Sequence, residues 1–290
     1  MKILITADLH YEVSRSREAA RRLAEKVLAT AGDVLVLVGD TAGAKLKPMR
    51  EALALFADFP GRKLLVPGNH CLWCFGAENS MDRYLHVLPD LAAEAGFHLL
   101  DHEPLILDDV GLVGSVGWYD YSFREESLGI PEAFYRAKLT PGAAEYLGGY
   151  GELLERHRGH LTGRHYSMGT RWMDGVYVKL GMSDEEFAAL LVEKLARQLA
   201  EIAPRVERIV AFVHHLPFAD LVPRNRPDHF AFAAAFMGTE RLGQVLLDCP
   251  KVTHVYCGHS HWRRSVRVGH VRVVNVGSTY VDKRLEILEV

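Results

Sequence analysis

The sequence has few cysteines, no long apolar run and no excess of either charge. Four cysteines in 290 residues are too few for a disulfide framework. No apolar run approaches the roughly 20 residues of a membrane-spanning helix. A net charge of −3 gives no general attraction to nucleic acid or to a membrane surface. Because the first residues carry only a very short apolar stretch, we expect no signal peptide and a cytoplasmic protein.

The composition is that of a globular protein, with 49% hydrophobic and 24% charged residues. This balance excludes a disordered chain, a collagen-like fibre and a coiled coil. There is no internal repeat, low-complexity tract or linker rich in proline and serine. We therefore expect a single domain over residues 1–290. Nothing in the sequence indicates its oligomeric state.

Strand and helix patterns alternate in the first part of the chain. Apolar runs at 3–5, 34–38 and 63–66 predict buried strands, and helical spacing of apolar residues predicts helices at 16–30 and 48–58. This order predicts a parallel sheet with right-handed crossovers. Ligands of such sheets bind at the carboxyl ends of the strands.

The second half of the chain predicts more strands and one long helix. The expected strands are at 105–107, 112–114, 209–213 and 253–257, with a hairpin at 266–268 and 271–273 and an edge strand at 284–289. A capping box at 183–186 opens a helix that extends to about residue 202. Its expected apolar face comprises Phe187, Leu190, Leu191, Leu195 and Leu199.

Residues 118–182 break this pattern. The segment holds seven of the eleven tyrosines, several glycines and no clear strand. We expect an aromatic-rich insertion that caps the active site, because long loops of α/β enzymes gather at the active edge. Its aromatic side chains would stack on a base or an acyl group, and its arginines would bind phosphate. The alternative is a satellite subdomain with its own aromatic core.

Each predicted strand of the core is followed by polar residues that can bind a metal ion. In chain order they are Asp8, His10, Asp40, Asn69, His70, His214, His215, His259 and His261. Carboxylates, imidazoles and an amide are oxygen and nitrogen ligands for divalent transition metals. Any one of these motifs alone would be an ordinary polar loop, but all of them together, each ending an apolar run, indicate a metal site.

The spacing of these residues has a physical meaning. In extended chain, residues i and i+2 point to the same side, so Asp8 with His10 and His259 with His261 can each direct two ligands into one site. Asp40 stands alone after Gly39, where its two carboxylate oxygens can bridge two ions. Two ions about 3.5–4 Å apart hold the attacking and leaving oxygens of an in-line displacement at phosphorus.

The order of these motifs resembles that of the calcineurin-like metallophosphoesterases. The shared motifs are Asp8-Leu9-His10, Gly39-Asp40, Gly68-Asn69-His70, His214-His215-Leu216-Pro217 and Gly258-His259-Ser260-His261. The resemblance implies an α/β fold in four αββα layers, with two central mixed β-sheets flanked by helices. It also implies a binuclear metal-dependent phosphoric ester hydrolase.

The resemblance assigns a role to each of these residues. It implies that the first ion is held by Asp8, His10, Asp40 and His261, and the second by Asp40, Asn69, His214 and His259. It implies that His70 is the general acid and that a metal-bound hydroxide attacks phosphorus. Manganese is the expected metal, with iron and zinc as alternatives, because these ligands suit all three.

The sequence departs from the family pattern near His70. Cys71 stands where the family often has an acidic residue, and Gly43 stands where some members have an aspartate that braces the catalytic histidine. What orients His70 is therefore left open. The register of His-x-x-Pro favours His214 as the ligand, which leaves His215 to face the substrate or to pack. Trp118 and Tyr119 are further candidate substrate contacts.

Several functions remain open at this point. The expected substrate is a small-molecule or nucleotide phosphate ester, and a phosphodiesterase is favoured over a phosphomonoesterase (phosphatase) by a narrow margin. A nucleic-acid substrate is not supported by the charge. The rival class is a metal-bound scaffold or binding protein without catalysis. A redox protein built on Cys71 and Cys74 is a third class, although a Cys-x-x-Cys pair without further ligands is more often structural.

Overall fold

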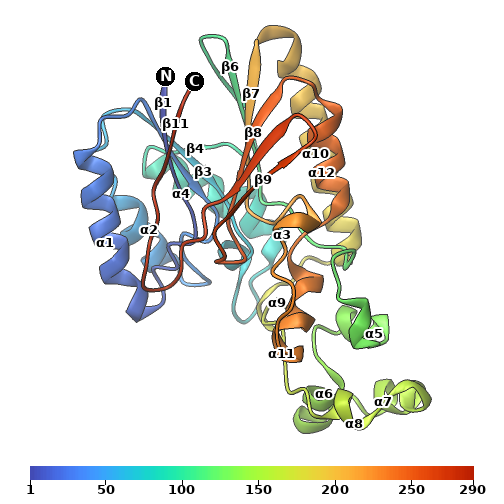
Figure 1. Ribbon diagram of the computed structural model, residues 1–290. Helices are drawn as coiled ribbons and strands as arrows, with labels where there is room; N and C mark the ends of the chain where they lie inside the picture. The colour runs from blue at the N-terminus through green and yellow to red at the C-terminus, as the bar shows by residue number, and fades with distance from the viewer.

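Two mixed β-sheets lie at the centre of the structure, a computed structural model that describes residues 1–290 (Figure 1). The first sheet has the order β11-β1-β2-β3-β4. Its strands are β1 (Lys2–Thr6), β2 (Val34–Val38), β3 (Arg62–Val66), β4 (His98–Leu99) and β11 (Glu286–Glu289). Only β11 is antiparallel to its neighbour, and it forms the edge beside β1. The predicted C-terminal edge strand is therefore confirmed.

The second sheet has the order β5-β6-β7-β8-β10-β9. Its strands are β5 (Leu105–Leu107), β6 (Val110–Ser115), β7 (Arg208–Val213), β8 (Val252–Cys257), β9 (Arg264–Val268) and β10 (Val271–Asn275). The two edge strands β5 and β9 are antiparallel to their neighbours, and the strands between them are parallel.

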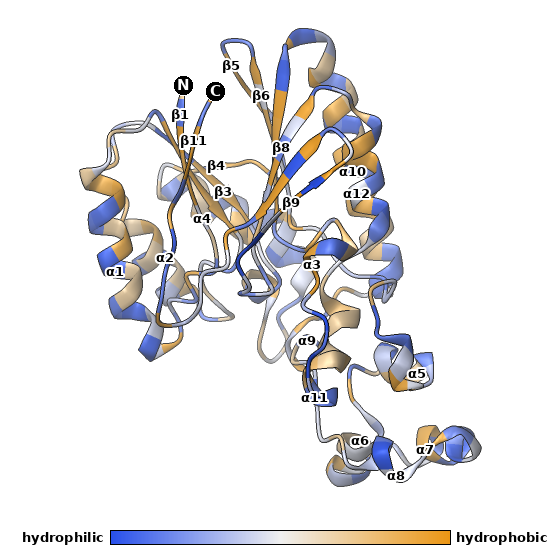
Figure 2. Cartoon of the chain, in the orientation of Figure 1, coloured by the Kyte–Doolittle hydropathy of each residue, from blue (hydrophilic) through white to orange (hydrophobic).

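The two sheets pack face to face, and helices cover their outer faces. One hydrophobic cluster joins Ile3, Val36 and Val66 of the first sheet to Leu112 and Phe212 of the second. The strands are apolar on both faces because the opposite side chains pack under helices (Figure 2). The predicted four-layer αββα architecture is confirmed.

The helices of the outer layers lie on opposite sides of the molecule (Figure 1). The first sheet is covered by α1 (Ser14–Ala29), α2 (Leu46–Ala54) and α4 (Leu88–Glu94), and the second by α10 (Asp184–Ile202) and α12 (Glu240–Asp248). Helix α2 ends four residues earlier than expected. Helix α12 and strand β4 were not predicted, since both patterns are short.

Helix α10 begins with the predicted capping box. The hydroxyl of Ser183 accepts a hydrogen bond from the backbone N–H of Glu186, and the Glu186 carboxylate accepts one from the N–H of Ser183. Phe187 and Leu191 are buried as expected. Leu190 is 36% exposed, so its placement on the buried face was wrong. It is one position away from Leu191 and therefore points about 100° around the helix.

The segment 118–182 lies between β6 and α10 and contains only short helices. These are α5 (Glu132–Arg136), α6 (Pro141–Leu147), α7 (Gly151–His157), α8 (Gly163–Tyr166) and α9 (Asp174–Tyr177). Helices α5 to α8 project away from the sheets, whereas α9 lies close to them (Figure 1). Further short helices in the chain are α3 (Ser80–Asp82) and α11 (Asp228–Ala231).

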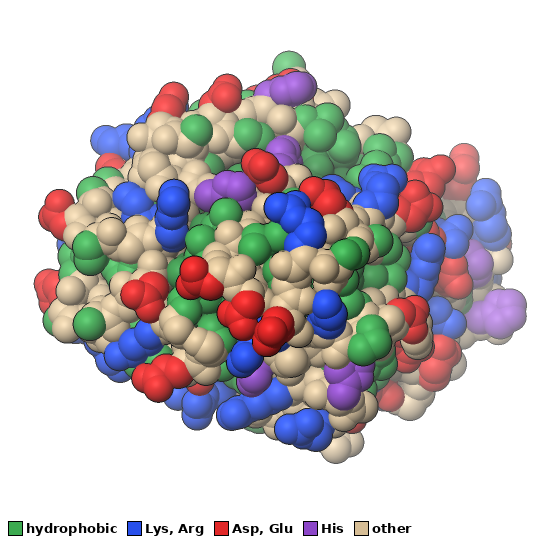
Figure 3. Space-filling view, turned by 90° about the horizontal axis from the view of Figure 1, so that it is seen from above, with side chains coloured by type: hydrophobic (Ala, Val, Ile, Leu, Met, Phe, Trp, Pro, Cys, Tyr) green, Lys and Arg blue, Asp and Glu red, His purple; other side chains and the backbone are tan.

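Figure 3 shows the side of the molecule that carries the termini. Acidic and basic side chains alternate over this face without a patch of one sign (Figure 3). None of the helices combines the length and the apolar character needed to cross a membrane.

Candidate metal centre

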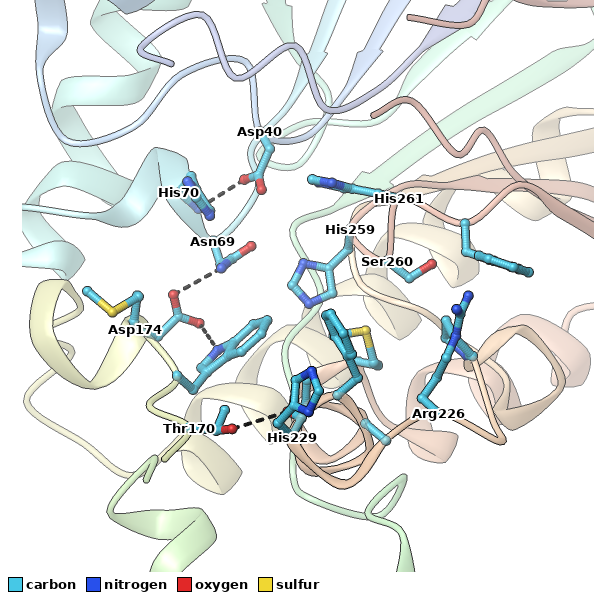
Figure 4. A pocket seen from close by; sticks show the side chains of 18 of the residues that line it. Asp40, Asn69, His70, Thr170, Asp174, Arg226, His229, His259, Ser260 and His261 are labelled. Carbon is cyan, nitrogen blue, oxygen red and sulfur yellow. Dashed lines mark hydrogen bonds between the residues drawn. The ribbon is translucent and has the colours of Figure 1, made fainter. Parts of the chain in front are cut away.

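The predicted ligands come together at the carboxyl ends of five strands. Asp8 and His10 follow β1, Asp40 follows β2, Asn69 and His70 follow β3, His214 follows β7, and His259 and His261 follow β8. Figure 4 shows several of these side chains turned toward one cavity. The site therefore takes ligands from both sheets, as expected where parallel strands end.

The ligand atoms fall into two groups. In the first, Nε2 of His10 lies 3.0 Å from Nε2 of His261, which lies 3.8 Å from Oδ1 of Asp8. In the second, Nε2 of His214 lies 3.2 Å from Oδ1 of Asn69. The ligand atoms of Asp40, His214 and His259 also lie within 4.8 Å of one another. These groups match the two ion sites that the resemblance implies.

Asp40 faces both groups through a single oxygen. Its Oδ2 is 3.5 Å from Nε2 of His10 and 3.4 Å from Nε2 of His214. Its Oδ1 instead accepts a hydrogen bond of 2.9 Å from the backbone N–H of His70. Oδ2 is therefore the oxygen of Asp40 that faces both groups, and Asp40 would help to hold a cation in each.

The donor set fits divalent cations. Oδ1 of Asp8 accepts a hydrogen bond from the backbone N–H of His259, but its Oδ2 is buried without any partner. A buried carboxylate oxygen without a partner is costly unless a cation neutralises it. Nε2 of His10 and Nε2 of His261 lie 3.0 Å apart, a separation that suits two ligands of one ion.

Burial and mutual charge hold several of these groups, but not all, in the protonation states that bind metals. Burial raises the pKa of Asp8, and Asp40 outweighs burial and raises the pKa of His214. Burial lowers the pKa of His10, brings that of His261 to about 4 and holds that of His259 well below its ordinary value. Burial alone would raise the pKa of Asp40, but His214 and other histidines outweigh it and keep the pKa well below the usual range. Neutral imidazoles and an ionised carboxylate are the forms that metals bind.

The ligand loops have unusual backbone conformations. Asp8, His10, Asp40, His259 and His261 have φ values of 58°, 43°, 48°, 69° and 54°, in the left-handed region that L-residues rarely adopt. Such strain concentrates at functional sites. The prediction that each i, i+2 pair directs two ligands into one group holds for Asp8 and His10 but not for His259 and His261, which fall in different groups. The reason given for it was also wrong, because these loops are not extended.

Two glycines allow the ligands to approach closely. A Cβ atom on Gly39 would lie 1.9 Å from Nδ1 of His214, and one on Gly68 would lie 2.2 Å from Oδ1 of Asp40. No side chain can occupy these places while the ligands stay where they are. The glycines of the motifs therefore make room for neighbouring ligands.

Asp174 of the insertion positions Asn69 and was missed by the sequence analysis. Its buried carboxylate accepts hydrogen bonds from Nδ2 of Asn69 (2.9 Å), from the indole N–H groups of Trp73 and Trp172 (2.6 and 2.8 Å) and from the hydroxyl of Tyr119 (3.1 Å). Because Nδ2 points to Asp174, the amide oxygen of Asn69 faces His214. The separation of 105 positions between Asn69 and Asp174 hides this contact from any local pattern.

Glu12 is the carboxylate that contacts His70. Its Oε1 lies 3.2 Å from Nδ1 of His70 and 3.4 Å from Nδ1 of His10. It also lies 3.1 Å from the place of a Cβ atom on Gly43, so Glu12 fills the space that an aspartate at position 43 would enter. The ring of His70 stacks on Trp73 with centroids 3.6 Å apart. These contacts answer the question of what orients His70.

The comparison with known families agrees with this geometry. A model of the calcineurin-like phosphoesterase family matches residues 1–263. The chain belongs to the calcineurin-like phosphoesterases. A search of the curated proteins found no match.

Solved structures share the fold of this phosphoesterase. The phosphopantetheinyl hydrolase of Mycobacterium tuberculosis is 18% identical with a TM-score of 0.66, over 97% of this chain and 90% of that one. TT1561 of Thermus thermophilus is 11% identical with a TM-score of 0.54, over 99% and 97%. A dimetal phosphatase from Danio rerio is 13% identical with a TM-score of 0.53, over 99% and 91%.

The three substrate contacts predicted from the sequence do not line the cavity of the phosphoesterase. Trp118, Tyr119 and His215 are fully buried, which contradicts a direct contact with substrate. The indole N–H of Trp118 donates to Asp184, and the hydroxyl of Tyr119 donates to Asp174. The ring of His215 packs 4.2 Å from that of His259, and burial lowers its pKa to about 3.

The cysteines of this phosphoesterase form no disulfide. Cys71, Cys74 and Cys257 are buried, and only Cys249 is partly exposed. Burial raises the pKa of Cys71 to about 11, so its reactive thiolate form is scarce at neutral pH. This environment disfavours the redox reading of Cys71 and Cys74.

Alkylation of the native phosphoesterase with iodoacetamide at pH 7.5 should therefore label Cys249 and spare Cys71. Peptide mass spectrometry before and after unfolding in guanidinium checks this, since all four thiols should react once unfolded. Rapid labelling of Cys71 in the native state, with loss of turnover that thiol reverses, would restore the redox hypothesis.

Asp174→Asn should weaken binding at the second ion site. An amide at this position cannot accept from all four donors, so the Asn69 oxygen loses its fixed direction. Loss of an outer-shell partner typically lowers metal affinity by about 10- to 100-fold. Metal titration of the apo protein by calorimetry measures this.

Asp228→Asn is the matched control, because Asp228 is exposed and pairs only with Arg164. It should bind metal like the unmodified protein. If Asp174→Asn binds metal at both sites as tightly as the unmodified protein does, and circular dichroism shows an intact fold, Asp174 does not position Asn69.

Proposed function

We propose that this calcineurin-like phosphoesterase is a binuclear metal-dependent hydrolase of phosphate esters, and a phosphodiesterase in preference to a phosphomonoesterase. The observation that carries the proposal is the complete ligand set with His70 beside it at one cavity. Its lining includes Asp40, Asn69, His70, His259 and His261. A scaffold protein of this fold would have no need for a braced histidine beside the ligands.

In this proposal the ligands divide into two sets. Asp8, His10, Asp40 and His261 hold one ion, and Asp40, Asn69, His214 and His259 hold the other. When bound, the two cations would stabilise the negative charge of the phosphoryl oxygens and lower the pKa of coordinated water. Manganese is the metal that we favour, with iron and zinc as alternatives.

His70 is the general acid of the proposed reaction. Its Nδ1 contacts Glu12, which as a carboxylate can only accept, so this nitrogen carries a proton. The other nitrogen, Nε2, is free to donate to the leaving oxygen. Burial alone would lower the pKa of His70, but Asp40 and Glu12 outweigh it and raise the pKa, which favours the charged, proton-donating form.

The cavity supports a diester substrate. Its volume of about 640 Å³ exceeds what a phosphate group alone requires, and its lining includes apolar side chains such as Trp172, Met173 and Met237. A diester needs room for two substituents, which this cavity offers. The similar structure of a phosphopantetheinyl hydrolase is a reason to include a phosphopantetheine ester among the substrates tested.

The segment 118–182 acts in this proposal as a cap within a single domain of residues 1–290. Residues 170–174 line the cavity, and Asp174 ties this part of the segment to Asn69. Helices α5 to α8, which precede these residues in the chain, project away from the sheets (Figure 1). The cap therefore contributes one wall of the substrate site rather than covering all of it.

Metal-stripped protein should regain turnover of bis-p-nitrophenyl phosphate when manganese is added, and should hydrolyse it faster than p-nitrophenyl phosphate. Iron and zinc are compared in parallel. Asp40→Ala should abolish turnover, because it removes a ligand of both ions. Binding of two ions per chain without turnover of any ester would favour the scaffold, and a faster monoester reaction would reverse the diester preference.

Glu12→Gln should lower kcat more for diphenyl phosphate than for bis-p-nitrophenyl phosphate. Nitrophenolate leaves without much help from an acid, whereas phenolate needs a proton, and general acids contribute about 10²- to 10⁴-fold. His70→Ala should show the same dependence on the leaving group. Steady-state kinetics with matched metal content measures both.

Glu12→Ala combined with Gly43→Asp should restore part of the lost rate. The new carboxylate would then enter the space vacated by Glu12, within reach of the His70 ring. Equal losses on both esters in Glu12→Gln, together with no rescue by the double variant, would show that Glu12 serves the fold and not the acid.

A further inference from the structure

The cavity extends well beyond the metal ligands. Figure 4 shows Asp40, His70 and His261 along one side and Thr170, His229 and Arg226 on the other. The second side is built from the insertion, from the chain between β7 and α12, and from Trp262. A substrate with its phosphate at the metal centre therefore has a second, separate surface to contact.

Two arginines on this surface have no acidic partner. Arg171 and Arg226 line the cavity, and their guanidinium groups form no hydrogen bond or ion pair with the protein. Nearby arginines behave differently, since Arg164 pairs with Asp228 and Arg224 pairs with Glu125. A free guanidinium in a cavity is suited to bind a phosphate or carboxylate group with several hydrogen bonds.

Two large aromatic side chains stand beside these arginines. Phe230 is 61% exposed and Trp262 is 47% exposed, although both line the cavity. The guanidinium carbon of Arg226 lies 4.1 Å from the centroid of the Trp262 ring. Exposed aromatic rings next to a cation provide stacking surfaces for a planar ring of a ligand.

We propose that Arg171, Arg226, Phe230 and Trp262 form a distal subsite that binds the nucleotide part of a phosphodiester substrate. The base stacks on Phe230 or Trp262, and a second phosphate group binds the two guanidinium groups. The ester phosphate lies at the metal centre. This inference rests on the proposed hydrolase function, and in the reaction water cleaves the P–O bond to the leaving group, whose oxygen takes a proton.

The pairing of the surrounding charges favours a small anionic ligand over an acidic protein. Arg164 and Arg224 outside the cavity are neutralised by carboxylates, so an acidic partner would find few free cations there. Arg171 and Arg226 instead leave their positive charge free where they line the cavity, with the Trp262 ring beside Arg226. A phosphopantetheine ester on a protein has neither a planar ring nor a second phosphate at this place.

Three chromogenic diesters separate the contributions of the subsite. The first is bis-p-nitrophenyl phosphate, and the second is the p-nitrophenyl ester of thymidine 5′-monophosphate, which adds a base. The third is the 5′-p-nitrophenyl ester of thymidine 3′,5′-bisphosphate, which adds a second phosphate. We expect kcat/KM of the manganese-loaded protein to rise along this series.

Each variant of the subsite should reduce the gain in kcat/KM between two successive substrates of the series. Arg226→Gln and Arg171→Gln should reduce the ratio of kcat/KM between the bisphosphate and monophosphate esters by about tenfold or more, as expected when a hydrogen bond to a charged group is lost. Trp262→Ala should reduce the ratio between the monophosphate ester and bis-p-nitrophenyl phosphate. Arg224→Gln is the matched control, because Arg224 pairs with Glu125 and does not line the cavity.

The outcomes keep the two proposals apart. Turnover of bis-p-nitrophenyl phosphate without a rise along the series, or with ratios unchanged in the variants, would overturn the distal subsite and leave the hydrolase intact. Faster turnover of a protein-bound phosphopantetheine ester than of any nucleotide ester would also overturn it. If no ester is hydrolysed, the hydrolase fails, and calorimetry with thymidine 3′,5′-bisphosphate decides: binding weakened in Arg226→Gln supports the subsite, and no binding refutes it.

Discussion

The structure depends on the burial of two carboxylates, Asp8 and Asp40, at the ends of neighbouring strands. Burying an ionised group is costly unless polar groups and charges surround it. Backbone N–H groups of His259 and His70 each supply one hydrogen bond, and histidines supply the nearest ring nitrogens. The left-handed backbone of the ligand loops and the bare glycines between them follow from this requirement. The packed layers of apolar strands and helices offset the free-energy cost of the strained backbone at this site.

The cap and the metal centre form one hydrogen-bonded unit. Asp174 belongs to the segment that departs most from the regular strand-helix alternation, yet it fixes the direction of the Asn69 amide. The same carboxylate holds Trp172 and Trp73, and Trp73 stacks on His70. A movement of this wall would therefore change the ligand and the acid together. A substrate that contacts residues 170–174 would in this way be coupled to the centre of the proposed reaction.

The sequence predicts the layers, and it singles out candidate ligands that the structure brings together at one end of the sheets, because both depend on local patterns. Apolar runs closed by Gly-Asp or Gly-His need no knowledge of distant contacts, whereas Glu12 and Asp174 act only through residues 58 and 105 positions away. The aromatic pair Trp118 and Tyr119 was misread for the same reason, since composition does not show which rings the fold buries. Left-handed turns that the sequence does not specify place Asp8 and His10 in one group but put His259 and His261 in different groups.

One carboxylate serves both a proposed ligand and the proposed acid. Oε1 of Glu12 lies within reach of Nδ1 of His10 and Nδ1 of His70, while its Oε2 is buried without a partner. A proton on each Nδ1 leaves Nε2 of His10 with its lone pair free for a cation and turns Nε2 of His70 toward the cavity. The pKa of Glu12 is about 2 because the two histidines outweigh the effect of burial, so the carboxylate keeps its charge. An aspartate at position 43 would instead reach His70 from the loop after β2, whereas Glu12 belongs to the loop after β1 that carries His10. By placing the carboxylate two residues after His10, the chain fixes the tautomer of the ligand and the orientation of the acid with one group.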